Sequence, residues 1–317
     1  MKIAILGPSP IPYTMGGAEN LHLGLAGAFA EHTPHQVELL KVPVRETSFW
    51  EVIDSYHQFY KMDVSQFDAV VCCKYPAWMV RHPNCLYYVL HRLRGLYDTY
   101  PPTLPLEVDR GDRLVDKVLD YMETNRQPKR LDGFFALLEE LKENKDAIAP
   151  GYFGFPGPLI RKIVHYMDDF GMGQNGGAPC YAISRTVKRR KAYCPKDAKV
   201  EVVYPPPYRV DATPGDFKHL FVVSRLDGPK RLDLLVQAMA HVKSDIKLYI
   251  AGTGPDESKL KALAQGDPRI VFLGYVGDEE VHRYYADSLA VPYFPLSLQH
   301  IRRCPRSHLC SSLSTPE

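Results

Sequence analysis

Short runs of β-branched and aliphatic residues alternate with amphipathic segments along most of this chain, and this alternation limits its possible folds more than any other feature. Such runs occupy residues 2–7, 37–42, 68–73, 86–90, 179–183 and 199–203. Between residues 90 and 179, apolar side chains recur at i, i+3, i+4 and i+7 over 115–122, 131–138 and 160–167, which is the spacing of one helix face. Strands that alternate with helices favour parallel sheets covered on both faces, so we predict the α/β class.

A proline-rich segment at 204–208 interrupts the alternation. Its three successive prolines can neither continue a helix nor pair in the middle of a sheet, so we expect an extended connector. The pattern restarts beyond it, with strands expected at 220–223, 248–251, 270–273 and 289–293 and helices at 232–239, 255–264 and 278–286. We predict two Rossmann-like, doubly wound domains, 1–207 and 208–296, the second incomplete. Residues 297–317 lack periodicity and are expected to form an irregular, removable tail.

Composition excludes several classes of protein. The 39 Lys and Arg residues nearly balance 37 Asp and Glu, which argues against a nucleic-acid partner. No apolar run approaches the roughly 20 residues of a transmembrane helix. Seven cysteines without C-x-x-C spacing, and no export signal, predict reduced thiols, a cytoplasmic location and no metal site.

A glycine pair, Gly16 and Gly17, follows the first strand and precedes a helix. Glycines let backbone N–H groups approach a ligand, and a helix N-terminus favours an anion. The segment does not match G-x-G-x-x-G, which disfavours a dehydrogenase. A tight turn without a ligand is the alternative.

A second candidate site follows the strand at 220–223, where Ser224, Arg225 and Lys230 lie in a short loop before the next helix. Ligands of open α/β sheets bind at the carboxyl ends of strands, and two cations there suit a pyrophosphate. The next strand ends in Gly252-Thr253-Gly254, a weaker signal. The alternative is a solvated basic loop.

His91 lies at the end of the strand at 86–90 and could contact a sugar or a phosphate. A structural or merely exposed histidine is the alternative. The basic run at 185–191 has no interleaved aromatic residues, so we interpret it as a solvated helix face.

These segments, in this order, resemble the retaining glycosyltransferases of family 4, which have the GT-B fold of two Rossmann-like domains. Besides His91, the resemblance is carried by GGAE at 16–19, YAIS at 181–184, VYPP at 203–206, VSRL at 223–226 with KR at 230–231, IAGTG at 250–254, IVFLG at 270–274 and AVPYFP at 290–295. It extends from residue 1 to about residue 296.

The resemblance implies transfer of a sugar, with retention, from a nucleoside-diphosphate sugar to a glycan, lipid or small-molecule acceptor, without a metal or other cofactor. Arg225 and Lys230 would hold the donor pyrophosphate and offset the charge of the leaving diphosphate. Ser224, Gly252 and Gly254 would complete this phosphate site. By the same resemblance, Gly16 and Gly17 would lie against the donor phosphate or the acceptor, and His91 would contact the transferred sugar.

The chain departs from the family pattern after residue 296. Family members carry a Glu-x7-Glu motif there, whereas this sequence has no Glu between Glu280 and Glu317. We expect an unrelated ending, as a shifted reading frame or an alternative terminus would leave, and impaired transfer. Two alternatives remain, namely a non-catalytic nucleotide- or sugar-binding protein and a nucleotide-sugar epimerase of the same fold.

Overall fold

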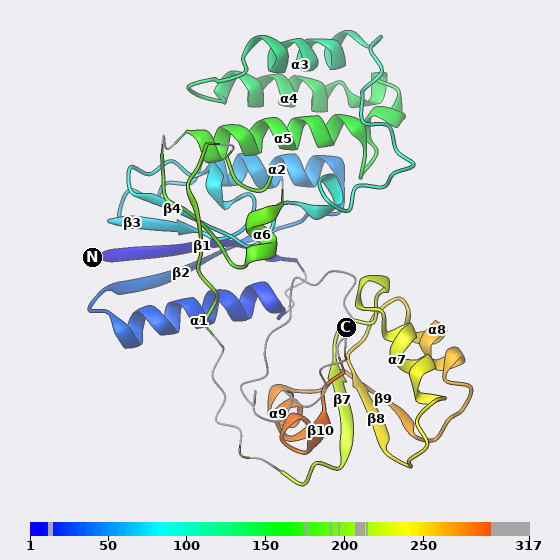
Figure 1. Cartoon of the computed structure of the whole chain (residues 1–317). Helices are drawn as coiled ribbons and strands as arrows, with labels where there is room; N and C mark the ends of the chain where they lie inside the picture. The colour runs from blue at the N-terminus through cyan, green and yellow to red at the C-terminus, as the bar shows by residue number, and fades with distance from the viewer. Residues whose placement is uncertain are drawn as a thin grey trace. The chain divides into compact units, whose positions relative to one another are not determined.

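Two parallel β-sheets organise the chain in a computed structural model, one sheet in each of two units (Figure 1). The units are Met1–Tyr208 and Arg209–Glu317. The structure describes residues 1–11, 15–174, 177–190, 192–195, 197–206, 213 and 215–292. The α/β class with two parallel sheets is therefore confirmed. The tail expected at 297–317 lies outside the described residues.

The first unit contains a six-stranded sheet of order β2-β1-β3-β4-β5-β6. Its strands are β1 (Lys2–Pro10), β2 (Gln36–Val44), β3 (Ala69–Cys72), β4 (Cys85–Val89), β5 (Cys180–Ala182) and β6 (Val200–Val202). Each coincides with a run predicted from the sequence. Strand β1 lies between β2 and β3, and its residues 3–8 are all buried, as expected for a central parallel strand.

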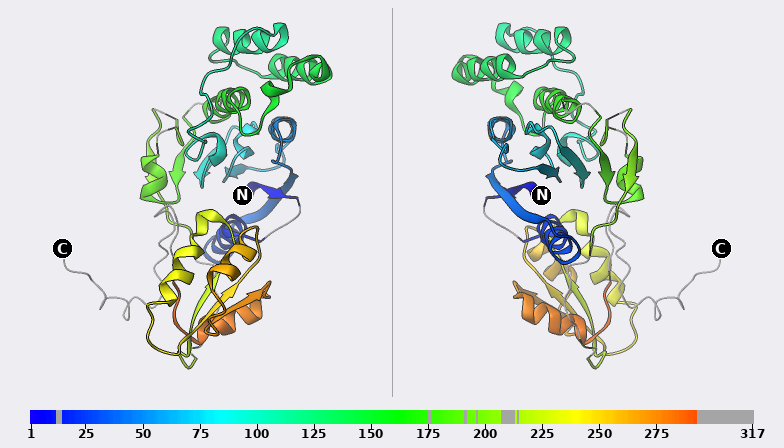
Figure 2. Two further views of the ribbon diagram at one scale, coloured as in Figure 1. Left: turned by 90° about the vertical axis from the view of Figure 1, so that its right-hand side faces the viewer. Right: turned by 90° about the vertical axis from the view of Figure 1, so that its left-hand side faces the viewer.

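Helices cover both faces of this sheet. The α-helices are α1 (Gly17–His32), α2 (Phe49–Tyr60), α3 (Arg113–Thr124), α4 (Asp132–Glu143), α5 (Pro158–Gly173) and α6 (Arg185–Arg189), and the short 3-10 turns are η1 (Ala77–Met79), η2 (Arg94–Leu96), η3 (Lys145–Ala147) and η4 (Pro150–Phe153). Helix α1 packs on one face, whereas α2 and α5 cover the other (Figures 1 and 2). Helices α3 and α4 pack together as an outer layer beyond α5 (Figure 2).

Helix α2 is the one α-helix of this unit that the sequence analysis did not predict. Its buried residues Phe49, Val52, Ile53, Tyr56 and Phe59 are spaced three or four apart along most of its length. The Ser48 side chain caps it by accepting a hydrogen bond from the Glu51 amide at 3.4 Å. The signal was therefore present, but polar residues between the apolar ones obscured it.

The second unit contains a four-stranded sheet, within the described residues, of order β10-β7-β8-β9. Its elements are β7 (His219–Val223), η5 (Gly228–Lys230), α7 (Leu232–Met239), β8 (Lys247–Ala251), α8 (Glu257–Leu263), β9 (Ile270–Gly274), α9 (Asp278–Ala286) and β10 (Ser288–Ala290). Helices α7 and α8 pack together on one face, and α9 lies on the other (Figure 1). Strand β10 is shorter than the strand expected at 289–293. Residue 293 lies outside the described residues.

Strand order reverses once in each sheet. The first sheet grows from β1 to β2 and then continues with β3 on the other side of β1, and the second places β8 and β10 on opposite sides of β7. Such a reversal opens a crevice at the carboxyl ends of the strands, where open α/β sheets bind ligands. The segments that follow β1 and β7 are therefore where a site is expected.

No helix among the described residues has the length and apolar character needed to cross a membrane.

Candidate functional site

The loop that follows β7 lies at the reversal point of the second sheet and is tied to the loop that follows β8. The Ser224 amide donates to the Ala251 carbonyl and the Leu226 amide to the Thr253 carbonyl, both at 3.0 Å. These bonds continue the β7–β8 pairing past the ends of the strands. The residues on both sides of Arg225 are therefore held in place by backbone hydrogen bonds.

Gly252 and Gly254 allow this close approach. A Cβ atom on Gly252 would lie 1.9 Å from the Ser224 carbonyl oxygen, and one on Gly254 would lie 2.3 Å from the Leu226 carbonyl oxygen. Gly252 also has φ +121°, a conformation that side chains disfavour. Both glycines are thus required by backbone packing, and their expected contact with a donor phosphate stays a prediction.

Arg225 of this loop is exposed, whereas Lys230 is half-buried. The Arg225 side chain is 72% exposed and its Nη2 lies 2.7 Å from Asp227 Oδ2. Lys230 ends the 3-10 turn that precedes α7, and no ion pair engages its ammonium within the described residues. The other Asp227 oxygen, Oδ1, is buried and has no partner among them. Ser224, Arg225 and Lys230 therefore share one loop beside the N-terminus of α7.

Gly16 and Gly17 lie at the corresponding point of the first sheet. Gly16 caps α1 with extended backbone and no side-chain hydrogen bond, and Gly17 is the first helical residue. A Cβ on Gly17 would meet no atom within 4 Å, so nothing in the described structure requires glycine there. On Gly16 it would lie 3.1 Å from the carboxylate of Glu19, which folds back toward the helix start.

A buried polar cluster below this turn was missed by the sequence analysis. His22 is fully buried against Gly7, and Lys41 Nζ lies 3.0 Å from His22 Nδ1 and 3.4 Å from Glu19 Oε1. Since an ammonium only donates, Nδ1 of His22 accepts. Burial, with the charges of Lys41 and Lys74, lowers the pKa of His22 to about 3. The signal was a histidine on the apolar face of the helix predicted after Gly17.

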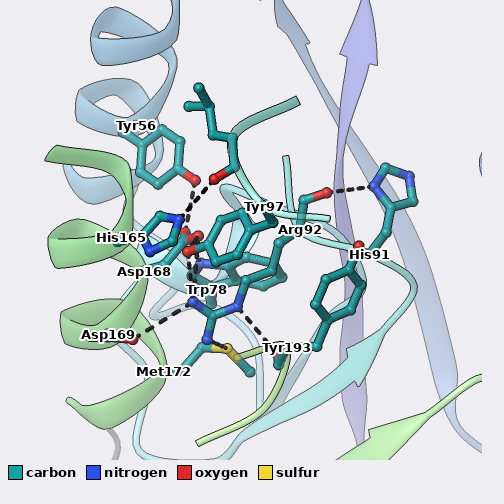
Figure 3. Close-up of polar contacts among 11 residues, drawn as sticks. Tyr56, Trp78, His91, Arg92, Tyr97, His165, Asp168, Asp169, Met172 and Tyr193 are labelled. Atoms are coloured by element: carbon teal, nitrogen blue, oxygen red, sulfur yellow. Dashed lines mark hydrogen bonds and ion pairs between the residues drawn. The ribbon is translucent and has the colours of Figure 1, made fainter. Parts of the chain in front are cut away.

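His91 lies two residues beyond β4, half-buried at the carboxyl end of the first sheet. Its Nδ1 is 2.8 Å from the Arg92 carbonyl oxygen (Figure 3). Because a carbonyl oxygen only accepts, Nδ1 carries the proton and Nε2 keeps its lone pair. Burial, reinforced by Lys74, lowers the pKa of His91 to about 4, so the ring is neutral at pH 7. His91 can thus accept a hydrogen bond from a hydroxyl group.

Comparison with known proteins gives one family match. Residues 217–299, which include the Arg225 loop and all of β7 to β10, match the family described as "Glycosyl transferases group 1". The comparison with curated proteins gives no significant match.

Several solved structures are similar over most of the chain. HepE of Anabaena, in complex with UDP-glucose, is 12% identical, with 94% of this chain and 74% of that chain covered and a TM-score of 0.48. AviGT4, a glycosyltransferase involved in avilamycin A biosynthesis, is 14% identical (95% and 72% covered, TM-score 0.44). WaaG, a glycosyltransferase involved in lipopolysaccharide biosynthesis, is 12% identical (94% and 76% covered, TM-score 0.43). At these identities and TM-scores, the similarities assign neither a substrate nor an acceptor to this chain.

Proposed function

We propose that this chain is a retaining glycosyltransferase of the GT-B class, similar to family 4, which uses a nucleoside-diphosphate sugar as its donor. One observation carries the proposal. The segment that matches the group 1 glycosyltransferases contains a loop at a sheet reversal point, and this loop presents an exposed arginine and an unpaired lysine among the described residues. Cations at such a point suit the diphosphate of the donor.

Arg225 and Lys230 would act on the diphosphate in two ways. They would bind the donor in the ground state, and they would stabilise the negative charge that grows on the leaving diphosphate as the glycosidic bond breaks. Asp227 pairs with Arg225 at 2.7 Å and would hold that side chain in place until a phosphate competes for it. Gly252 and Gly254 support this role indirectly, because they allow the close packing that fixes the loop.

His91 would bind the transferred sugar. Its free Nε2 lone pair can accept a hydrogen bond from a sugar hydroxyl, and its low pKa keeps that lone pair available at neutral pH. Gly17 would give the donor phosphate or the acceptor access to the start of α1, since no described atom would lie within 4 Å of a Cβ at this position.

Calorimetric titration with UDP, GDP and ADP tests the donor site. Arg225→Ala or Lys230→Ala should each weaken binding by roughly 10- to 150-fold, the range expected when a charge-assisted hydrogen bond is lost. Two control cations lie in the same unit. Arg283 on α9 is also 72% exposed with one acidic partner, Glu280 at 3.5 Å, and Lys259 on α8 is exposed. Equal affinities for the site variants, the control variants Arg283→Ala and Lys259→Ala, and the unmodified protein would refute the site.

Product analysis distinguishes the remaining functions. Incubation with UDP-glucose, UDP-galactose or GDP-mannose and an acceptor mixture should release nucleoside diphosphate, and NMR of the new anomeric centre should show the donor's configuration. Conversion of the donor into its epimer would favour an epimerase instead. Nucleotide binding without any release of diphosphate would favour a binding protein, an outcome consistent with the absence of Glu between Glu280 and Glu317.

A further inference from the structure

Asp168 is a charged residue in the middle of the core of the first unit. It lies on α5 with no exposed surface, and its oxygens accept three hydrogen bonds (Figure 3). The donors are Tyr56 of α2 at 2.7 Å, Trp78 of η1 at 2.8 Å and the hydroxyl of Tyr97 at 2.6 Å. Three separate segments therefore form hydrogen bonds to one carboxylate, which links them to α5.

Arg92 is the cation that accompanies this carboxylate. Its side chain is only 2% exposed, and Nη1 lies 3.6 Å from both Asp168 and Asp169. The other guanidinium contacts are Nη1 to the Tyr97 hydroxyl at 2.8 Å, Nε to the Tyr193 carbonyl at 3.3 Å and Nη2 to Met172 Sδ at 3.3 Å. The planar fork of arginine suits this set of directions, and a lysine ammonium could not reach them together.

The segment after Arg92 is held to the same helix. The Tyr97 ring stacks on His165 of α5 with centroids 3.9 Å apart, and His165 Nε2 donates to the Leu96 carbonyl at 2.9 Å. Both ends of the segment from Arg92 to Tyr97 are thus held to α5. The Arg92 carbonyl, which accepts the proton of His91 Nδ1, belongs to this fixed segment.

We propose that Arg92 and Asp168 are positioning residues that fix the orientation of His91 and hold its ring in the tautomer with a free Nε2. The inference rests on the proposed function for the role of Nε2 toward a sugar hydroxyl. Neither Arg92 nor Asp168 touches substrate in this scheme. Both act through the backbone carbonyl that follows His91.

A purely structural role would have different consequences. Replacing both members of a buried ion pair by apolar residues often leaves the fold intact, whereas removing one member leaves an uncompensated buried charge. The single variants are therefore compared by the state of the His91 ring and not by their stability. Arg92→Met removes the guanidinium but leaves Asp168 with its three donors. Asp168→Asn keeps an oxygen for Tyr56 and Trp78 while removing the charge. A matched control is Arg161→Met, because Arg161 of α5 lies over the Tyr100 ring at 5.3 Å, much as Arg92 lies over Tyr97 at 5.2 Å.

The test uses the full chain with ¹⁵N-labelled histidine. Long-range ¹H–¹⁵N spectra, with His91→Asn to assign the ring, should show a protonated Nδ1 in the unmodified protein and in Arg161→Met. In Arg92→Met and Asp168→Asn, the ring should become a mixture of tautomers. Transfer should then fall on the order of 100-fold in kcat, since misplacement by about 1 Å has that effect, with KM for the donor little changed. Arg92→Lys, which keeps the charge without the fork, should behave like Arg92→Met.

An unchanged His91 spectrum in the variants that fold would overturn the positioning role. The spectra need no catalytic activity, so this failure is separate from a failure of the proposed function. If the tautomer shifts as expected while His91→Asn transfers sugar at the normal rate, the positioning role stands and the sugar contact of His91 is wrong.

Discussion

Arg92 and Arg225 follow strands of the two sheets, yet their surroundings are opposite. Arg92 is 2% exposed and all of its guanidinium nitrogens have partners, whereas Arg225 is 72% exposed with Asp227 as its ion-pair partner among the described residues. A guanidinium buried to this degree is not accessible to a ligand. An exposed one with a single acidic partner can exchange that partner for a phosphate at little cost. Burial thus separates a cation that holds the protein together from one that can bind substrate.

The same contrast extends to the two units. In the first unit, β1 and α5 are buried over most of their length, and charged residues such as Asp168 are enclosed with partners. In the second unit, β9 is only half-buried throughout and α9 has no buried residue. We therefore expect substitutions of charged residues to affect stability in the first unit and ligand binding in the second.

The largest expected effect is the loss of Arg92. Arg92→Ala leaves the Asp168 carboxylate buried without its cation, and breaking a buried pair in this way costs about 3–5 kcal/mol of unfolding free energy. Both tryptophans, Trp50 and Trp78, lie in the first unit, so urea unfolding followed by tryptophan fluorescence reports on that unit. If Arg92→Ala lowers the free energy of unfolding by less than about 1 kcal/mol, the buried arginine stabilises the protein no more than an exposed one does.

The second-largest loss of stability is expected at acidic pH, in the first unit. The pKa values of His22 and His165, lowered by burial to about 3 and about 4, lie below the value of about 6.5 in the unfolded chain. At a pH between the folded-state and unfolded-state pKa values, the unfolded state binds more protons than the folded state. The free energy of unfolding is therefore highest above pH 6.5 and falls as the pH drops toward the pKa values of the folded state. At pH 5, each of the two histidines should lower the free energy of unfolding by about 2 kcal/mol relative to neutral pH.

This acid effect is measured by tryptophan fluorescence in urea at pH 7.5, 6, 5 and 4.5. His165→Gln keeps a donor for the Leu96 carbonyl and does not titrate, so it should flatten the profile by about one histidine's share. A profile that is flat in the unmodified protein would contradict the assignment of neutral, buried rings.

Glycine substitutions should have intermediate effects and should differ between the units. Gly252→Ala forces a Cβ against the Ser224 carbonyl at a φ of +121°, which should cost about 1–3 kcal/mol and weaken nucleotide binding by displacing the Arg225 loop. The new methyl group of Gly17→Ala meets no atom of the described part of the chain within 4 Å, so stability should change by less than about 1 kcal/mol. Hydrogen exchange over residues 219–290 measures the effect of Gly252→Ala on the second unit, and scanning calorimetry of both variants compares their losses of stability. Equal losses would mean that Gly17 is also fixed by packing.

The smallest effect on stability is expected for the exposed arginines themselves. Arg225→Ala and Arg283→Ala each remove one exposed ion pair, and such pairs contribute at most about 1 kcal/mol. Their midpoints of thermal unfolding should therefore agree closely, while only Arg225→Ala weakens nucleotide binding. A marked loss of stability in Arg225→Ala alone would indicate that the cation shapes its loop.

The strands could be predicted from the sequence because each is a short aliphatic run, and a buried parallel strand needs little else. The Arg225 loop was found for a similar reason, since its cations lie within a few residues of a strand end. Helix α2 was missed because its apolar residues are interrupted by Glu51, Asp54 and His57.

The polar clusters of the first unit depend on contacts between distant segments, and local pattern does not contain them. Asp168 is an exception in part, because it falls four residues after Val164 on the apolar face of α5, where a carboxylate needs an explanation. Its partner Arg92 gave no such signal. For Gly252 and Gly254, the family resemblance implied a phosphate contact, whereas the structure adds a backbone-packing requirement that no sequence motif states.

The pairing of β4 with β5 has a consequence for how the first unit folds. Tyr87 and Cys180 are partners in adjacent strands, although helices α3, α4 and α5 intervene between them in the chain. Closing so long a loop is entropically costly before any pairing rewards it, and non-local pairing slows folding. Strands β1 to β4 can associate early, whereas β5 and β6 must wait for the intervening helices. Conditions that unfold α5 should therefore detach β5 and β6 and expose the edge of β4, and an exposed strand edge can pair with a strand of another chain.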